Sequence, residues 1–409
     1  MSSPEPLTGP LAGIKVLDLS RVLAGPWSGQ MLGDLGAEVI KVEQPGQGDD
    51  TRKWGPPFLP DGSRDSAYYL CANRNKRSVA IDISKPEGQD LVRQLAAQSD
   101  IVLENFRVGG LAKYGLDYPA LKAVKPDLIY CSITGFGQTG PDQDKGGYDF
   151  LIQGMSGLMS VTGEADGHPL KVGIPVSDLT TGLYATISIL AALQHRSRTG
   201  EGQQIDLALL DAQVAMLANQ ASNWLNGGID PRRMGNQHPT IVPYQDFACA
   251  DGDVLIALGN DRQFVGLMKV LGLPELGKDP RFALSANRSD NREALFAAIK
   301  PVIAAWKSDD LIAALEAAKL PGGRINSIPE ALAQPQIEAR QMVREIARDD
   351  GTPVKFLGFP ARLSASPATY RLAPPRSGQD TRRVLSEALG LPDGEIDALA
   401  AQGIVAETL

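Results

Sequence analysis

Short apolar runs alternate with longer amphipathic stretches in the N-terminal part of the chain. The runs have the length of buried strands: Ile14–Leu19, Val39–Val42, Val79–Ile83, Ile101–Glu104 and Leu128–Ile133. Helical patterns separate some of them, at Pro26–Leu35 and Pro86–Gln98, and the first begins at a proline and ends before a glycine, as helices prefer. This alternation predicts an α/β fold, a Rossmann-like layer with a parallel sheet covered by helices on both faces.

The pattern changes after the expected sheet. Two long helices are predicted, followed by a smaller α+β segment between two linkers rich in Gly, Pro, Asn or Gln. The predicted parts are helices Leu179–Arg198 and Asp206–Leu225, linker 226–243, a small domain at 244–326 with strand Val254–Leu258 and helix Arg292–Trp306, linker 327–337, and a tail with strand Val354–Leu357 and helix Thr381–Leu389.

Composition narrows the class of protein. Apolar residues make up 43% and charged residues 22% of the chain, as in soluble enzymes, and the net charge of −8 argues against nucleic-acid binding. The three cysteines form no CxxC pair, so neither disulfides nor a zinc site is expected. The start, MSSPEPLTGP, resembles no targeting signal, and Leu183–Leu193 is too short to span a bilayer. We therefore expect a cytoplasmic protein that binds no membrane.

Asp178 stands where an apolar helix is predicted to begin. Ser177 or Asp178 in this place is an ordinary N-cap, which is one interpretation. The helix dipole favours an ionised carboxylate there, and an ionised carboxylate is also what covalent catalysis requires, so the second interpretation is a nucleophile. The two interpretations are compatible.

Two further segments each allow a purely structural and a functional interpretation. The loop Val22–Pro26 is either a tight strand-to-helix turn or a loop whose N–H groups face a ligand at the carboxyl edge of the sheet. It contains no GxGxxG fingerprint. The charge run Asn73–Arg77 is either solvated or offers an arginine to an acidic acyl group.

Long strings in the chain resemble the family III CoA-transferases, closest to the branch that transfers CoA between succinate and glutarate. The strings are LSRVLAGPWSGQMLGDLGAEVIKVEQPGQGDDTRKWGPPF at 19–58, NRNKRS at 73–78, YCSITGFGQTGP at 130–141, SDLTTGLYA at 177–185 and IVPYQDF at 241–247. The spacing of Gly173, Pro175, Asp178 and Gly182 also matches the motif around the catalytic aspartate of that family.

The resemblance implies a fold and a partner. The family fold is an interlocked homodimer, in which each chain forms a ring threaded by the other. By this likeness, residues 1–225 and 338–409 form one large CoA-binding domain built from both ends of the chain, and the small domain lies between the two linkers.

The resemblance also assigns residues to CoA. Leu23 and Ala24 would line the thioester, and formyl-CoA transferase has a glutamine in place of Leu23. Lys113 and Gln44 stand where relatives carry arginines, so these contacts would be weaker or lost. The remaining positions aligned with CoA-lining residues are Ile81, Asp82, Ile83, Ser84, Asn105, Phe106, Arg107, Lys145, Gly146, Gly147 and Tyr148. Gly259–Phe264 would cover the site, or be a plain surface turn.

Tyr148 separates this chain from a sister group, the α-methylacyl-CoA racemases, which have a catalytic histidine there. None of the histidines, His168, His195 and His238, falls in that motif. The resemblance thus implies a CoA-transferase that forms an aspartyl-CoA thioester on Asp178, with succinyl-CoA as donor and a small dicarboxylic acid as acceptor. No cofactor beyond CoA and no metal is expected. A racemase and a catalytically silent CoA-binding protein are the alternatives.

Overall fold

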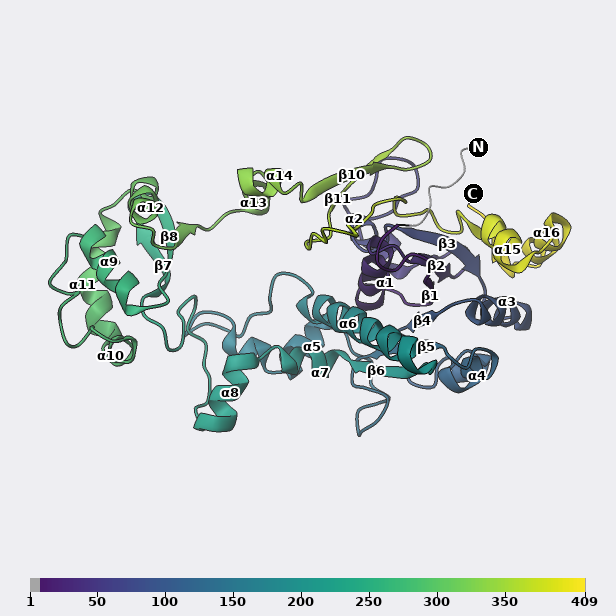
Figure 1. Ribbon diagram of the computed structural model, residues 1–409, viewed down its shortest axis with the longest axis horizontal. Helices are drawn as coiled ribbons and strands as arrows, with labels where there is room; N and C mark the ends of the chain where they lie inside the picture. The colour runs from purple at the N-terminus through teal and green to yellow at the C-terminus, as the bar shows by residue number, and fades with distance from the viewer. Residues whose placement is uncertain (1–7, 409) are drawn as a thin grey trace. The chain divides into compact units, whose positions relative to one another are not determined.

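The computed structural model describes residues 8–408 (Figure 1). The segment 1–7, where most of the stretch tested for a targeting signal falls, is outside the described residues. The chain divides into two compact units. The larger unit contains the chain up to Leu158, Val172–Ala221 and the C-terminal part from Glu338, and the smaller unit contains Met159–Lys171 and Ser222–Ile337.

A seven-stranded sheet organises the larger unit, in the order β12-β3-β2-β1-β4-β5-β6. All neighbours pair in parallel except β12, which is antiparallel to β3, so the predicted mostly parallel α/β fold is confirmed. Its strands are β1 (Lys15–Asp18), β2 (Glu38–Glu43), β3 (Lys76–Ile81), β4 (Ile101–Glu104), β5 (Ile129–Thr134), β6 (Gln204–Ala208) and β12 (Val405–Ala406).

Helices cover both faces of this sheet because its strand residues alternate between them. Leu17 packs on the face covered by α3, α4, α15 and α16, whereas Val16 packs on the face covered by α1, α5, α6 and α7. The bounds are α1 (Ala24–Asp34), α3 (Pro86–Ala97), α4 (Tyr118–Val124), α5 (Asp149–Met155), α6 (Val176–Thr199), α7 (Leu209–Ala215), α15 (Thr381–Leu389) and α16 (Asp393–Ala401). The C-terminal helices thus complete a core that the N-terminal strands begin.

The smaller unit has an antiparallel sheet, β7-β8-β9, with helices packed on it. Arg233 donates to the carbonyls of Glu164 and Gly167, which ties 159–171 into this unit. Its elements are β7 (Tyr244–Cys249), β8 (Gly252–Ala257), β9 (Gly322–Arg324), α9 (Asp261–Val270), α10 (Ser285–Asp290), α11 (Arg292–Ala304), α12 (Ser308–Ala317) and α13 (Ile328–Leu332).

The predicted helix Asp206–Leu225 is wrong. Residues Gln204–Ala208 form the edge strand β6, and helices α7 and α8 (Ala218–Gly227) follow. In β6 the side chains of Ile205 and Leu207 pack on the core while Gln204 and Asp206 are exposed, which is the two-residue period of a strand. Elements that the sequence did not predict include α4, α5, β7, β9, α16, β12 and the strand β10 (Val343–Ala347), which pairs with β11 (Pro353–Leu357).

One helix, α6, passes a test of length and composition for crossing a membrane. The stretch Leu183–Leu193, which was predicted to be too short to span a bilayer, lies within this longer helix of 24 residues. Ala185, Ile189 and Ala192 are nevertheless buried in the core of the larger unit. One face of α6 therefore packs in the core of the larger unit.

Buried ion pairs join the C-terminal part of the larger unit to its N-terminal part. Arg348 lies 2.6 Å from Asp61 and 2.7 Å from Asp65. Arg52 pairs with Asp65 at 2.7 Å and with Glu43 at 2.6 Å. All five side chains are almost fully buried, so each carboxylate depends on its arginine for compensation.

Replacement of Arg348 by methionine is expected to destabilise the protein by about 3–5 kcal/mol, because it removes one partner of a buried ionic network. Urea unfolding measures the loss. Lys125→Met is the control: Lys125 pairs with Asp127 at 3.0 Å near the surface, so the expected loss is below about 1 kcal/mol. Equal losses for the two variants would contradict the argument.

Candidate active site

A cavity of 460 Å³ lies in the larger unit, beside the carboxyl ends of β1, β4 and β5. Open parallel sheets bind ligands at this edge. The cavity brings together residues that are far apart in sequence, since Arg21, Leu23, Asp178 and Leu209 all line it. The sequence-predicted residues that line it are Leu23, Ala24, Asn105, Phe106, Arg107, Lys113, Lys145, Gly146, Gly147, Tyr148 and Asp178.

The other predicted residues line a second cavity, of 200 Å³. They are Gln44, Ile81, Asp82, Ile83 and Ser84. Arg21, Phe106 and Tyr114 line both cavities, so the two are neighbours, and the Arg21 guanidinium lies over the Phe106 ring at 5.5 Å. The predicted residues thus form two adjoining groups within the larger unit, and their roles stay predictions.

Asp178 is the third residue of α6, which begins at Val176. The prediction that Ser177 or Asp178 caps this helix is therefore wrong, and Pro175 occupies the N-cap position. A carboxylate from another helix serves the free amides of the first turn instead: Asp149 Oδ1 accepts the N–H of Ser177 at 2.8 Å. Asp178 itself is half-buried and lines the cavity.

The electrostatic surroundings of Asp178 oppose its ionisation. Burial, followed by the negative charge of Asp149, raises the pKa of Asp178 to about 7. The expectation that the helix start favours the ionised form is thus wrong in direction, because desolvation and a like charge outweigh the dipole. Near neutral pH the carboxyl and carboxylate forms coexist.

A buried ionic cluster holds the loop between β1 and α1. The Lys41 ammonium donates to Ser20 O at 2.8 Å and lies 2.9 Å from Asp49 Oδ2. Asp49 Oδ1 also accepts the N–H of Val22 at 3.3 Å. Val22 has φ 70°, a left-handed conformation that a β-branched residue rarely adopts. The loop therefore presents Leu23 and Ala24 to the cavity in a strained geometry that its anchors maintain.

Gly182 allows α6 to approach α1 one turn beyond Asp178. A Cβ atom on Gly182 would lie 2.8 Å from Ala24 O and 3.0 Å from the Trp27 ring. The first of these is backbone, which cannot move aside cheaply. The glycine of the Asp178-to-Gly182 motif therefore has a packing reason, at the point where the nucleophile candidate meets the loop.

The charge run Asn73–Arg77 is neither solvated nor directed at the cavity. Arg74 is 4% exposed and makes two hydrogen bonds to Asp34, and Lys76 pairs with Asp18 at 2.9 Å. Both interpretations made from the sequence are wrong, because buried carboxylates elsewhere in the fold take up these cations. An arginine for an acidic acyl group must come from another position.

Sequence reasoning missed several residues near Asp178. Arg21 follows β1 directly and lines both cavities, and its place at the end of a strand was the available signal. Burial, followed by the charges of Asp178, Cys71 and Asp149, raises the pKa of Tyr68. Trp54 packs edge-on against Tyr68 at 5.2 Å. No local sequence pattern predicted the Trp54–Tyr68 pair.

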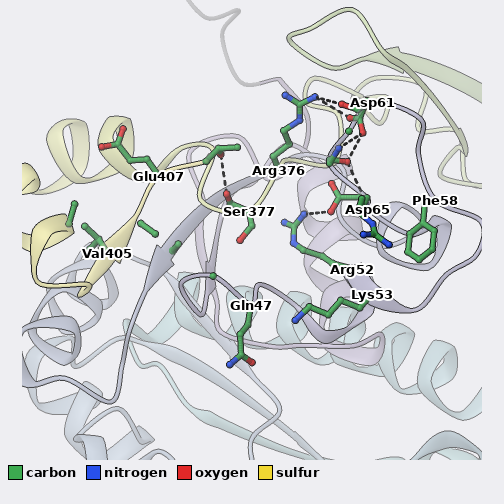
Figure 2. Close-up of a pocket in the computed structure, with 18 residues that line it drawn as sticks. Gln47, Arg52, Lys53, Phe58, Asp61, Asp65, Arg376, Ser377, Val405 and Glu407 are labelled. Atoms are coloured by element: carbon green, nitrogen blue, oxygen red, sulfur yellow. Dashed lines mark hydrogen bonds and ion pairs between the residues drawn. The ribbon is translucent and has the colours of Figure 1, made fainter.

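A third cavity, of 1170 Å³, lies beside the ion pairs of the C-terminal part (Figure 2). Some of its charged side chains pair with one another: Arg52 pairs with Asp65, and Arg376 with Asp61. The sequence-predicted site residues do not line it.

The Gly259–Phe264 segment belongs to the smaller unit. It leads from β8 into α9, where Asn260 Oδ1 accepts the N–H of Gln263 and Gln263 Oε1 accepts the N–H of Gly259. Its covering role stays a prediction. Within residues 8–408, no group of three or more His, Cys, Asp or Glu side chains could hold a metal ion.

An α/β sheet with a half-buried carboxylate in a cavity at its carboxyl edge suits an enzyme of covalent group transfer. The model of CoA-transferase family III matches residues 11–381, so the chain belongs to this family. The family recognised from the sequence motifs is thereby confirmed, and the chain is an enzyme of the CoA-transferase class.

Individual relatives agree with this assignment. The chain is 49% identical over 381 residues to the succinate–glutarate CoA-transferase of Agrobacterium fabrum, covering 92% of this chain and 95% of that protein. It is 41% identical over 396 residues to the human succinyl-CoA:glutarate CoA-transferase, covering 97% and 90%. The crystal structure of a CAIB/BAIF family protein from Brucella suis matches with a TM-score of 0.83 at 50% identity, covering 93% of this chain and all of that one.

Gly182→Ala is expected to lower stability by about 1–3 kcal/mol and to reduce activity, because the new methyl group pushes α6 away from Ala24. Thermal unfolding and steady-state kinetics measure the two effects. Gly173→Ala is a matched control from the same motif, since nothing lies within 4 Å of its Cβ position. If the control lost as much as Gly182→Ala, close packing would not explain the motif.

Proposed function

We propose that this enzyme transfers CoA from succinyl-CoA to a small dicarboxylic acid through an aspartyl-CoA thioester on Asp178. One observation carries the proposal: Asp178, a half-buried carboxylate at the start of α6, lines the same cavity as the loops expected to hold the thioester. The named activities of the relatives support the substrate class.

The mechanism proceeds by exchange of acyl groups. The Asp178 carboxylate attacks the carbonyl of the donor thioester, and a mixed anhydride and CoA thiolate result. The thiolate attacks the aspartyl carbonyl, so the donor acid leaves and an aspartyl-CoA thioester remains. The acceptor carboxylate attacks this thioester, and the steps reverse on the new acid. Backbone N–H groups of the Leu23–Ala24 loop stabilise the developing oxyanions.

Two adjoining cavities match the two ends of CoA. The 200 Å³ cavity has aliphatic walls from Ile81 and Ile83 and would hold the adenine ring. The larger cavity is lined by cations that suit phosphates and carboxylates: Arg21, Arg107, Lys113 and Lys145. Because Arg74 is engaged with Asp34, the distal carboxylate of the acceptor acid would meet one of these cations instead.

An exposed apolar face supports a homodimer. In the larger unit, Leu183 and Ile187 on α6 are 49% and 60% exposed, and Phe150 on α5 is 63% exposed. Contiguous apolar surface of this kind marks association sites. We propose that a second copy covers it, in the interlocked arrangement implied by the family, and that the dimer works in the cytoplasm.

The racemase alternative lacks support at the site. Such an enzyme needs a base opposite Asp178, and the described residues that line the cavity include no histidine. Tyr148 occupies the critical place and is 71% exposed. The transferase is therefore the function that the geometry favours.

Intact-protein mass spectrometry after mixing with succinyl-CoA is expected to show an adduct of the mass of CoA, less one water. Borohydride should reduce residue 178 in the wild type alone. Asp178→Ala should form no adduct and lose about 10³-fold or more of activity, because it removes the nucleophile. CoA binding by the variant serves as the folding control. A wild type that binds CoA without any adduct would overturn the proposal.

Dicarboxylic acids are expected to be better acceptors than monocarboxylic acids of equal length, since a second carboxylate can meet a cation of the cavity. The comparison of kcat/KM for glutarate and valerate tests this. Turnover of valerate with no turnover of dicarboxylates would exclude the dicarboxylate assignment while leaving the transferase intact.

A further inference from the structure

Asp149 is the carboxylate that lies against the start of α6. It is the first residue of α5, and its two oxygens are engaged on different sides. Oδ1 accepts the N–H of Ser177 at 2.8 Å, and Oδ2 accepts Nε2 of Gln153 at 2.7 Å. Its position is therefore fixed relative to the first turn that carries Asp178.

The neighbouring residue Ser177 is fixed from a second helix. Its hydroxyl donates to Gln213 Oε1 on α7 at 2.8 Å, and both side chains are fully buried. Asp178 follows Ser177 directly, so these bonds hold the backbone of Asp178 beside the Asp149 carboxylate. Residues from three helices, α5, α6 and α7, thus fix the turn that carries Asp178.

The groups that face Asp178 come from several elements. Asp149 on α5 and the Tyr68 phenol on α2 (Ala67–Leu70) are the nearby acidic groups, and the charges of Asp178 and Asp149 raise the pKa of Tyr68. The cavity wall adds the cations Arg21, Arg107, Lys113 and Lys145, together with Asp50. On α7, Asp211 is exposed. Of these charges, it is Asp149 that, after burial, raises the pKa of Asp178 to about 7.

We propose that Asp149 is a positioning residue that holds Asp178 in a destabilised ionised state, and that acylation relieves the repulsion between them. This inference rests on the proposed role of Asp178 as nucleophile. When both carboxyl groups are ionised, two negative charges share a half-buried site. Such repulsion disfavours the charged form and makes the carboxylate more basic.

The charge balance of the first step explains how the repulsion from Asp149 would speed the attack of Asp178. When Asp178 attacks, an O–C bond forms to the acyl carbon and the C–S bond of the donor breaks. The negative charge passes from Asp178 to the CoA sulfur. Asp178 is then part of a neutral anhydride, and afterwards of a neutral thioester. The repulsion is present before the step and absent after it, so it lowers the barrier.

The test follows adduct formation with succinyl-CoA by rapid-quench mass spectrometry from pH 5 to pH 9. In the wild type the rate should rise with pH through about 7 and then level off, because only the ionised form attacks. Asp149→Asn keeps an acceptor for the N–H of Ser177. In this variant the rising limb of the pH–rate profile should move at least one pH unit lower. The plateau should fall by up to about tenfold for each unit of that shift. At low pH the variant should therefore react at least as fast as the wild type, because its larger ionised fraction offsets the lower plateau.

Three controls separate charge from structure. Asp149→Glu retains the charge and should retain the wild-type limb. Gln153→Leu removes a hydrogen bond to Asp149 without changing its charge, so it should leave the limb in place. Asp211→Asn removes an exposed carboxylate from α7 and should change neither limb nor plateau.

The possible results distinguish failure of the inference about Asp149 from failure of the proposed function. A wild-type limb below pH 5 overturns the inference without any variant, so it stays testable even if Asp149→Asn fails to fold. A folded Asp149→Asn whose rate falls equally at every pH would show a merely structural role and would also overturn it. If the wild type forms no adduct on residue 178 at any pH, the proposed function itself is overturned. If the adduct forms but the limb of Asp149→Asn is unshifted, only the inference about Asp149 is overturned.

Discussion

The compensation of two fully buried ammonium groups is the constraint on which the site depends. Lys41 and Lys76 lie on β2 and β3 within the sheet, where water cannot solvate their charge. Asp49 and Asp18 neutralise them, and the same carboxylates hold the backbone of Ser20 and Val22. A strained loop costs about 1–3 kcal/mol, and these anchors keep it in place. The loop lies where α6 packs against α1. The buried ion pairs of Lys41 and Lys76 therefore support the region in which Asp178 meets the loop.

The sequence was sufficient for what depends on local pattern. Apolar runs such as Ile101–Leu103 lie within a strand because a strand buried on both faces is mostly apolar. Asp178 was identified from its motif, and the structure places it with Leu23, Arg107 and Lys145 around one cavity. The two-cavity division could also be anticipated, since the residues after β3 and those after β4 leave the sheet at different strands.

The predictions that failed concern residues whose contacts lie far away in the sequence. Asn73–Arg77 looks like a solvated charge run until Asp34 and Asp18 are known to face it. The cap of α6 could not be assigned, because Asp149 supplies it from another helix, 28 residues earlier. The pKa of Asp178 follows from that same neighbour and from burial. Strand β6 was missed because two apolar residues in an edge strand give too short a signal against a helical pattern that follows at once.

The return of the chain to the larger unit has a consequence for biosynthesis. Val384, Leu385 and Ile396 complete the core that Leu17 and Val79 begin, and β12 forms the edge of the sheet beside β3. A ribosome makes the N-terminal strands first and these residues last. Until helices α15 and α16 emerge, one face of the nascent sheet lacks part of its cover, and the smaller unit is already complete. The larger unit therefore folds late, after nearly the whole chain has been synthesised, and the exposed face is a natural target for chaperones in the interval.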